Sequence, residues 1–438
     1  MRDWLSLLAD PGSATPLPGD DESTAAARCR VGGHDVMAVW CRFDVSAGTL
    51  SVAAGQRFVA AVDAAVAAGV PVVAIANSGG ARMQEGTRAF VQMIPVTAAV
   101  RRLRDAGLGF VVYLANPTTG GVFASWASSG HVTFAEPGAT IGFTGPRVAE
   151  AIGEPIEPAA SQTAEGLFAN GQVDAVVPPE RLRDAVADVL SVLAPASPGE
   201  VRRPAESTAG PSGWAAVESS RRGDRHRVLD ELLRRSSATV ELQGDRSGSV
   251  DPDVLTAICR LEGRRTMVVA HRRTSSRPSA AGLRSARRAM AIAEELGLSV
   301  VTVIDTAGAV ISGEQERQGF AGEIARSIDA LTMLSVPTVA VVAGQGSGGA
   351  AIAWMSTDRV LAADDGWVAP IAPEAASAIV HRDVDHAGEM ADRQRVSALE
   401  LREQGIVDAV YAAEDLPDAV LVTLDDLAAA PRERRRRA

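Results

Sequence analysis

The strongest constraint on this chain is a pattern that it contains twice. A run of small and β-branched apolar residues followed by a polar turn begins at Gly69 as GVPVVAIANSGGA and again at Gly297 as GLSVVTVIDTAGA, an offset of 297 − 69 = 228 residues. The same offset relates further pairs: Gly120 and Gly348, Gly121 and Gly349, and Trp126 and Trp354. A register that holds without a gap from residue 69 to residue 138 is not expected by chance. The chain therefore has to fold as two copies of one architecture.

The stretch between the two copies has a different composition. Residues 194–227 are rich in Pro, Ser and Gly, the residue types that are typical of loops and linkers. We therefore predict an N-terminal domain over residues 1–193, a linker over 194–227 and a C-terminal domain over 228–438.

Within each copy, short apolar runs alternate with helical periodicity. Four runs rich in Val, Ile and Ala have the length of buried strands: residues 70–76, 109–115, 299–304 and 336–343. Residues 96–107 have the pattern of an amphipathic helix, with apolar residues at Val96, Val100 and Leu103 and a terminating Gly107. Alternating strands and helices predict an α/β fold with largely parallel strands in both domains.

Each glycine pair follows a predicted strand and precedes a predicted helix. The first turn of a helix has backbone N–H groups without partners, and the helix dipole makes that end electropositive. Glycine lets a ligand approach the backbone closely. The two pairs therefore predict two oxyanion sites, and close packing of helix against strand is the alternative that these residues leave open.

Composition excludes several classes of function. The net charge is −11, whereas general nucleic-acid binding needs a basic surface. No apolar run approaches the ~20 residues of a membrane-spanning helix. The three cysteines are too widely spaced for a disulfide framework or a zinc site, and the histidines form no H-x-x-x-H or H-E-x-x-H pattern. We therefore predict a cytoplasmic protein with no metal and with neither a nucleic-acid nor a membrane partner.

The sequence contains no lysine, because all 43 Lys+Arg residues are arginine. A P-loop lysine, a Schiff-base lysine and a biotinyl-lysine are therefore excluded within it. A serine hydrolase is disfavoured as well, because no G-x-S-x-G motif is present.

Longer motifs resemble a known family. Similarity to the β subunit of bacterial acetyl-CoA carboxylase carboxyltransferase covers SGGARMQEG (78–86), the stretch 117–148 that begins PTTGGVFASW, and AEGLFANGQVDAVV (164–177). Similarity to the α subunit covers LQGDR (242–246), IDTAGA (304–309), GQGSGGAAIA (344–353) and APEAASAIV (372–380). The chain thus resembles the β and α subunits fused in one polypeptide, which implies two tandem crotonase-like domains (ClpP/crotonase superfamily).

The resemblance implies an activity and the residues that perform it. Enzymes of this family move a carboxyl group between carboxybiotin and the α-carbon of an acyl-CoA, through enolates that oxyanion holes stabilise. By motif, Gly120 and Gly121 would hold the thioester oxygen, and Gly348 and Gly349 would hold the ureido oxygen of biotin. The other implied positions are Gly79, Gly80, Arg82, Gly142 and Gly145 for acyl-CoA or malonyl-CoA, and Gly308, Ala309 and Gly346 for biotin.

The resemblance also implies partners. Because this sequence has no lysine, biotin would be attached to a separate carrier chain, and a separate biotin carboxylase would load it. Active sites in the family are shared between protomers, so we expect a homodimer.

Departures from the family leave alternatives open. The four-cysteine zinc ribbon of the bacterial β subunit has no counterpart, M-G-G-S-M-G is replaced by VSAGTLS (45–51), and the P-G-A-Y-P-G loop beside biotin reads AGAVISG (307–313). Loss of both prolines removes a conformational restraint from this loop. A biotin-independent decarboxylase of a malonyl-type thioester is therefore one alternative, and a non-catalytic partner subunit is another.

Overall fold

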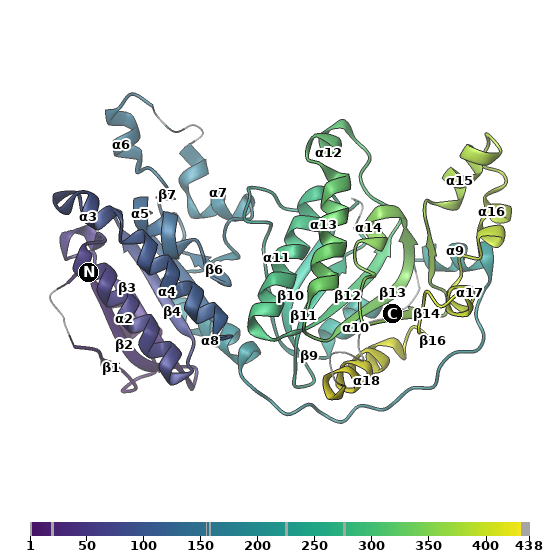
Figure 1. Ribbon diagram of the computed structural model, residues 1–438, viewed down its shortest axis with the longest axis horizontal. Helices are drawn as coiled ribbons and strands as arrows, with labels where there is room; N and C mark the ends of the chain where they lie inside the picture. Colours follow the sequence, from purple (N-terminus) through teal and green to yellow (C-terminus); the bar gives the residue numbers. More distant parts are fainter. Residues whose placement is uncertain are drawn as a thin grey trace. The chain divides into compact units, whose positions relative to one another are not determined.

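The structure, a computed structural model, describes residues 2–18, 22–154, 156, 159–223, 227–274 and 277–430. It divides into two compact units (Figure 1). Unit 1 comprises Met1–Ala194 together with Arg246–Ser249, and unit 2 comprises Pro195–Asp245 together with Val250–Ala438. Within the described residues, no helix is long and apolar enough to cross a membrane.

Unit 1 is built on an eight-stranded sheet in the order β1-β2-β3-β4-β5-β6-β8, with β7 paired to β5. β2 is antiparallel to β1 and β3, and all pairs from β3 onward are parallel. The strands are β1 (Thr15–Pro16), β2 (Thr24–Val31), β3 (His34–Cys41), β4 (Val72–Ser78), β5 (Phe110–Thr119), β6 (Val132–Ala135), β7 (Ile141–Gly142) and β8 (Ala175–Val176).

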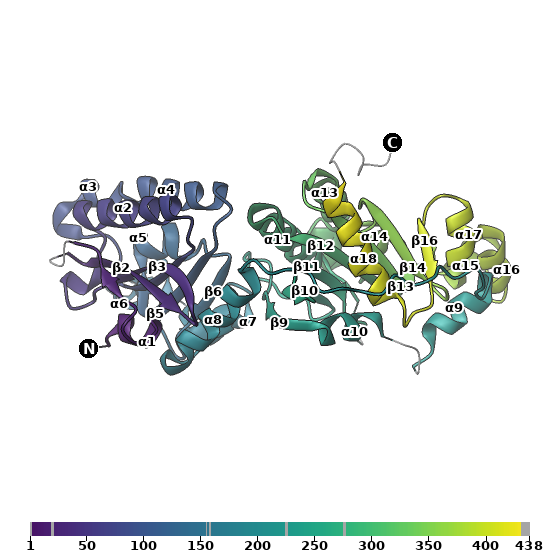
Figure 2. The ribbon, with the colours of Figure 1, turned by 90° about the horizontal axis from the view of Figure 1, so that it is seen from below.

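Helices cover both faces of this sheet. Figure 2 shows α2 and α4 on one side of it and α1 with α8 on the other. The helices are α1 (Trp4–Leu8), α2 (Val52–Ala68), α3 (Thr87–Phe90), α4 (Met93–Asp105), α5 (Gly120–Val122), α6 (Pro146–Ala151), α7 (Ala164–Ala169) and α8 (Leu182–Leu193). Short helical turns lie at η1 (Ser46–Gly48), η2 (Met83–Glu85), η3 (Phe123–Ala127), η4 (Ala159–Gln162) and η5 (Pro179–Arg181).

Unit 2 repeats this topology. Its sheet has the order β9-β10-β11-β12-β13-β14-β16, with β15 paired to β13 as β7 is paired to β5. The strands are β9 (Ser236–Glu241), β10 (Val254–Leu261), β11 (Arg264–His271), β12 (Ser299–Thr306), β13 (Thr338–Ser347), β14 (Arg359–Ala363), β15 (Trp367–Ala369) and β16 (Ala409–Tyr411).

The helices of unit 2 follow the same plan, with additions at its C-terminal end. α10 and α18 pack with residues of β10 to β14 in one hydrophobic cluster, and α11 packs against α13. The helices are α9 (Gly213–Arg221), α10 (Val228–Arg234), α11 (Ala280–Leu296), α12 (Gly313–Arg317), α13 (Phe320–Met333), α14 (Gly348–Ile352), α15 (Pro373–Val380), α16 (Ala387–Gln394), α17 (Ala398–Glu403) and α18 (Leu416–Ala429).

The long helices α2 and α11 show why both halves fold alike. Each is 17 residues long and follows a serine N-cap, Ser51 or Ser279. Each ends at a glycine in the left-handed region, Gly69 with φ 65° or Gly297 with φ 64°, where a side chain would be strained. The predicted α/β class and the predicted duplication are therefore confirmed.

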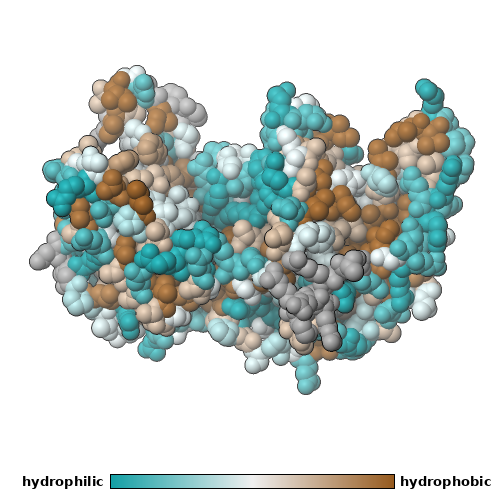
Figure 3. All heavy atoms as spheres, in the orientation of Figure 1, coloured by the Kyte–Doolittle hydropathy of each residue, from teal (hydrophilic) through white to brown (hydrophobic). Residues whose placement is uncertain are grey.

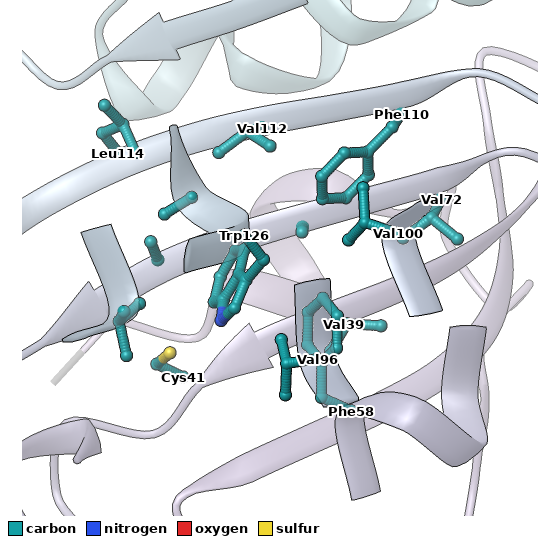
Figure 4. Packing of buried hydrophobic residues seen from close by; sticks show 14 of the residues in the cluster. Val39, Cys41, Phe58, Val72, Val96, Val100, Phe110, Val112, Leu114 and Trp126 are labelled. Atoms are coloured by element: carbon teal, nitrogen blue, oxygen red, sulfur yellow. The ribbon is translucent and has the colours of Figure 1, made fainter. Parts of the chain in front are cut away.

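The repeated tryptophans anchor the turn that follows each glycine pair. In unit 1, Trp126 stacks on Phe58 of α2 with ring centroids 4.9 Å apart, inside a cluster of apolar side chains from α2, α4 and the sheet (Figure 4). In unit 2, Trp354 stacks instead on His271 at the end of β11, at 4.1 Å. Burial lowers the pKa of His271 to about 3, so this imidazole is neutral at physiological pH.

The stretch 194–227, for which the sequence suggested a linker, contains helix α9. Trp214 and Val217 of α9 pack with Trp367 in a small hydrophobic cluster of unit 2, and Trp367 Nε1 donates a hydrogen bond to Ser220 Oγ at 2.8 Å. The extended residues before α9 also lie along unit 2, where Ser207 N–H donates to the carbonyl oxygen of Val410. Residues 224–226 of this stretch lie outside the described residues.

Candidate active site

Both glycine pairs lie where a strand of the parallel sheet ends and a short helix begins. β5 ends at Thr119 and is followed by Gly120, while β13 ends at Ser347 and is followed by Gly348. The two glycines take nearly the same left-handed conformation, with φ 63° for Gly120 and φ 69° for Gly348. The two candidate sites are thus the same turn in two copies of one fold.

Gly120 has to be glycine for two structural reasons. Its φ is positive, and a Cβ on it would lie 3.0 Å from the Cα of Gly80, a contact with backbone that cannot give way. Its N–H donates to the carbonyl oxygen of Phe143 at 2.9 Å. Gly120 therefore shapes the turn, while its own N–H group is already engaged.

The donors for an oxyanion in unit 1 are the next N–H groups along. Gly121 and Val122 lie in the first turn of α5, where a helix offers no acceptor of its own. Gly121 is buried, and a Cβ on it would approach Met93 Sδ at 3.1 Å. The predicted oxyanion role therefore fits Gly121 better than Gly120.

The structure brings the other predicted glycines of unit 1 to the same place. Gly80 follows β4 with φ 106°, and its N–H donates to Ser78 Oγ at 3.0 Å. Gly142 is paired with Thr119 across β5 and β7. A Cβ on Gly145 would lie 4.0 Å from Thr119 Oγ1. Gly79 precedes Gly80, and its N–H donates to the carbonyl oxygen of Ala47.

Arg82 differs from the other predicted residues of this site. Its Nη2 donates to Glu22 Oε1 at 2.7 Å and to Ser23 Oγ at 2.9 Å, and its side chain is only 15% exposed. Burial raises the pKa of Glu22, but hydrogen bonds from Ser23 and Arg82 outweigh it and hold that pKa below its ordinary value. This geometry favours a structural role for Arg82 over the predicted contact with acyl-CoA.

We expect Arg82→Ala to lower the free energy of unfolding by about 1–3 kcal/mol, because Glu22 loses its charged donor in a largely buried place. The dissociation constant for acyl-CoA should change by less than about threefold, as for a residue away from the ligand. Denaturant unfolding and calorimetric titration measure the two quantities. Much weaker binding at unchanged stability would restore the predicted contact.

In unit 2 the predicted biotin-side residues also converge. Thr306 Oγ1 accepts from the N–H of Gly308 at 3.2 Å, the counterpart of the bond between Ser78 and Gly80. A Cβ on Gly308 would lie 3.6 Å from Ser347 Oγ, and half-buried Ala309 follows it. Gly346 is paired with Val368 of β15. The loop after β12 and the turn at Gly348 are therefore in contact.

Gly349 takes the place of Gly121 in this second site. It is the second residue of α14, so its N–H has no acceptor within the helix. A Cβ on Gly349 would lie 2.4 Å from Ile324 Cδ1 of α13, so glycine is needed here for close packing as well. Across the described ranges, His, Cys, Asp and Glu side chains form no group of three or more that could hold a metal ion.

Sequence reasoning missed two residues that shape these sites. Phe143 contributes a backbone carbonyl oxygen that engages the N–H of Gly120, and a main-chain acceptor leaves no signal in residue type. His271 accepts the N–H of Asp305 at 3.3 Å while it stacks on Trp354. Its partner Trp354 was visible as a repeated residue, but His271 has Phe43 at the equivalent position of the first copy.

Comparison with known proteins agrees with this geometry. The family model described as the carboxyl transferase domain matches residues 13–437. The chain belongs to the carboxyl transferase domain family. The resemblance drawn from the sequence motifs is thereby confirmed, and it extends over both units.

Relatives of this carboxyl transferase carry informative names. It is 45% identical over 421 residues to the probable biotin-dependent acyl-coenzyme A carboxylase beta3 subunit of Mycobacterium tuberculosis (strain ATCC 25618 / H37Rv), covering 94% of this chain and 84% of that protein. It is 35% identical over 475 residues to the acetyl-coenzyme A carboxylase carboxyl transferase subunits beta/alpha of Salinispora arenicola, covering 95% and 84%.

A solved structure supports the fold. The crystal structure of transcarboxylase 12S, a hexamer assembly with methylmalonyl-coenzyme A and methylmalonic acid bound, matches with a TM-score of 0.82 at 20% sequence identity. The match covers 98% of this chain and 90% of that chain. The predicted crotonase-type architecture of the carboxyl transferase is therefore confirmed.

Proposed function

We propose that this chain is the carboxyltransferase component of a biotin-dependent acyl-CoA carboxylase. The observation that carries the proposal is the pair of equivalent turns at Gly120–Gly121 and Gly348–Gly349, each with a first-turn N–H group at the end of a buried strand. Carboxyl transfer at an α-carbon places negative charge on one oxygen of each reactant. Two oxyanion sites on one duplicated fold meet that requirement.

In unit 1, the N–H of Gly121 would donate to the thioester oxygen as the α-carbon gains or loses its carboxyl group. A donor placed at a developing oxyanion stabilises the transition state by ~2.7–4 kcal/mol. In unit 2, Gly349 and the loop at Gly308 would hold the ureido oxygen of biotin. Half-exposed Ile352 and Ile371 lie on α14 and just after β15, and they suit the apolar ring system of that group.

Lysine-linked biotin has to come from outside these 438 residues, because they contain no lysine. We therefore propose a separate biotin carrier and a biotin carboxylase as partners. The names of the relatives support this proposal, since they describe subunits of biotin-dependent carboxylases.

We also propose a homodimer in which the apolar residues around both turns are covered. Large apolar side chains are exposed at three pairs of positions that lie 228 residues apart: Met83 and Ile311, Phe143 and Ile371, and Ile152 and Val380. Figure 3 shows hydrophobic side chains over α6 and α15, where Ile152 and Val380 lie. Exposed apolar groups that recur at one place in both copies indicate a surface that another chain covers.

One observation favours a second candidate, the biotin-independent decarboxylase. The loop 307–313 lacks both family prolines, and Ile311 within it is 90% exposed. If this loop no longer received biotin, unit 1 alone could still stabilise the thioester oxygen while a malonyl-type substrate loses CO₂.

We expect turnover of malonyl-CoA or methylmalonyl-CoA to rise by about tenfold or more when free biotin is added, because the acceptor completes the second site. Loss of the substrate can be followed by chromatography at several biotin concentrations. Turnover that biotin does not affect would support the decarboxylase. Binding of acyl-CoA without turnover under either condition would support the non-catalytic subunit.

A further inference from the structure

The loop that follows β4 is tied to the start of helix α2 by two hydrogen bonds. The N–H of Arg82 donates to the carbonyl oxygen of Leu50 at 2.8 Å. Three residues farther along the loop, Glu85 Oε2 accepts from the N–H of Val52, the first residue of α2, at 2.8 Å. The loop is therefore held at both ends by one helix N-terminus.

Unit 2 contains the same arrangement. The N–H of Val310 donates to the carbonyl oxygen of Pro278 at 3.0 Å. Gln315 Oε1 accepts from the N–H of Ala280, the first residue of α11, at 2.7 Å. Three of the four positions lie 228 residues after their counterparts: Pro278 after Leu50, Ala280 after Val52, and Val310 after Arg82.

The fourth position does not follow the repeat. Adding 228 to 85 gives Gly313, which has no side chain, and the acceptor lies two residues later at Gln315. Ser312 makes this possible, because its Oγ accepts from the N–H of Gln315 and begins α12 there. Different residues thus reach the same helix N–H in the two units. We call these contacts the loop clamps: Glu85 with Val52, and Gln315 with Ala280.

Each clamped loop also touches the turn that carries the oxyanion donors. A Cβ on Gly80 would lie 3.2 Å from the Cα of Gly120 and 3.5 Å from the backbone nitrogen of Gly121. A Cβ on Gly308 would lie 3.6 Å from Ser347 Oγ. A shift of either loop would therefore change the walls of the adjacent site.

We propose that Glu85 and Gln315 are positioning residues, which fix the loops 79–86 and 307–313 against the thioester site and the biotin site respectively. The proposal rests on the function proposed above. In unit 2 the clamp has a further consequence, because the loop lacks the prolines that would stiffen it. Hydrogen bonds from Val310 and to Gln315 supply the restraint instead.

The two clamps also differ in charge. Glu85 is a carboxylate at the positive end of a 17-residue helix, and it forms an ion pair with Arg82 at 3.7 Å. Gln315 is a neutral amide at the equivalent place. Both side chains are half-buried, although most of their neighbours in the loops are exposed.

The test compares alanine variants, which lose the acceptor, with conservative variants, which keep one. We expect Glu85→Ala to raise the KM for acyl-CoA by about 10- to 100-fold, with the KM for free biotin within about threefold of wild type. Gln315→Ala should do the reverse. Glu85→Gln and Gln315→Glu should restore most of the affected constant, because each retains an oxygen that accepts the helix N–H.

Matched controls lie on the same elements. Gln318→Ala follows α12 and removes an amide that donates to Glu314, and Asp63→Ala removes a surface carboxylate of α2 that accepts from Arg102. Both should leave the two Michaelis constants and the unfolding temperature unchanged. Equal changes of both constants in either alanine variant, or no rescue by the conservative variants, would overturn the proposal.

Amide hydrogen exchange provides a readout that does not depend on activity. Residues 79–86 should exchange faster in Glu85→Ala than in Glu85→Gln, and residues 307–313 should exchange faster in Gln315→Ala than in Gln315→Glu. Unaltered exchange would overturn the clamps. Wild-type protein without biotin-dependent turnover would overturn the proposed function instead, so the two failures are distinguishable.

Discussion

Replacement of Gly121 by proline should lower the kcat of biotin-dependent turnover by about 100-fold or more. Gly121 is the second residue of α5, and its N–H has no acceptor within the helix. Proline is tolerated in the first turn of a helix but lacks the N–H group. The substitution therefore removes the donor that we assign to the thioester oxygen. Steady-state kinetics with malonyl-CoA and free biotin measure the effect.

Gly121→Ala is the matched control for this experiment. It keeps the N–H and adds a Cβ that would approach Met93 Sδ at 3.1 Å, a flexible side-chain atom that can move. Its kcat should remain within about fivefold of wild type. Gly120→Ala is unsuitable as a control, because its Cβ would meet the backbone of Gly80. A proline variant that binds acyl-CoA and retains wild-type kcat would refute the donor role of Gly121.

The architecture was predictable because the duplication is written in residue types. Gly69 and Gly297 end equivalent helices in a conformation that favours glycine, and the apolar runs after them form buried strands. The ends of two strands were not predictable in this way. β5 and β13 continue to Thr119 and Ser347, which is 119 − 115 = 4 and 347 − 343 = 4 residues beyond the apolar runs. Polar residues form these extensions because short strands β7 and β15 pair with them.

The site was predictable at the level of motifs but not of individual atoms. A glycine pair signals close approach of the backbone, yet it cannot tell which of two N–H groups is free. The carbonyl oxygen of Phe143 decides this in unit 1, because it already accepts the N–H of Gly120. Arg82 lies in a motif that suggests substrate binding, but Glu22 and Ser23 engage its side chain. Such assignments depend on tertiary contacts that residue spacing does not encode.

The loop clamps show the same limit from the other side. A sequence alignment of the two halves places Gly313 opposite Glu85 and thereby hides the contact. The structure shows that Gln315 accepts the equivalent helix N–H from two residues farther along. The two halves have therefore kept a geometric relationship while the residue that provides it has changed position and charge.

Replacement of Gly349 by proline should separate the two candidate functions. We expect biotin-dependent turnover to fall by about 100-fold or more, because the N–H assigned to the ureido oxygen is lost. The dissociation constant for acyl-CoA should stay within about threefold of wild type, since the thioester site lies in unit 1. A biotin-independent decarboxylase would instead retain its full rate, because its chemistry does not involve unit 2. Turnover measured with and without biotin, alongside calorimetric titration of acyl-CoA, distinguishes these results.

The control for this variant is Gly349→Ala. Alanine and proline both place a Cβ where Ile324 Cδ1 lies, 2.4 Å away, so both crowd α13 to a similar extent. Only proline removes the N–H, and the ratio of the two kcat values therefore isolates the hydrogen bond from the steric effect. Adding Ile324→Ala to both variants relieves the contact and should leave that ratio unchanged. Equal loss in the alanine and proline variants would mean that Gly349 serves packing alone, and the second oxyanion site would then have to be abandoned.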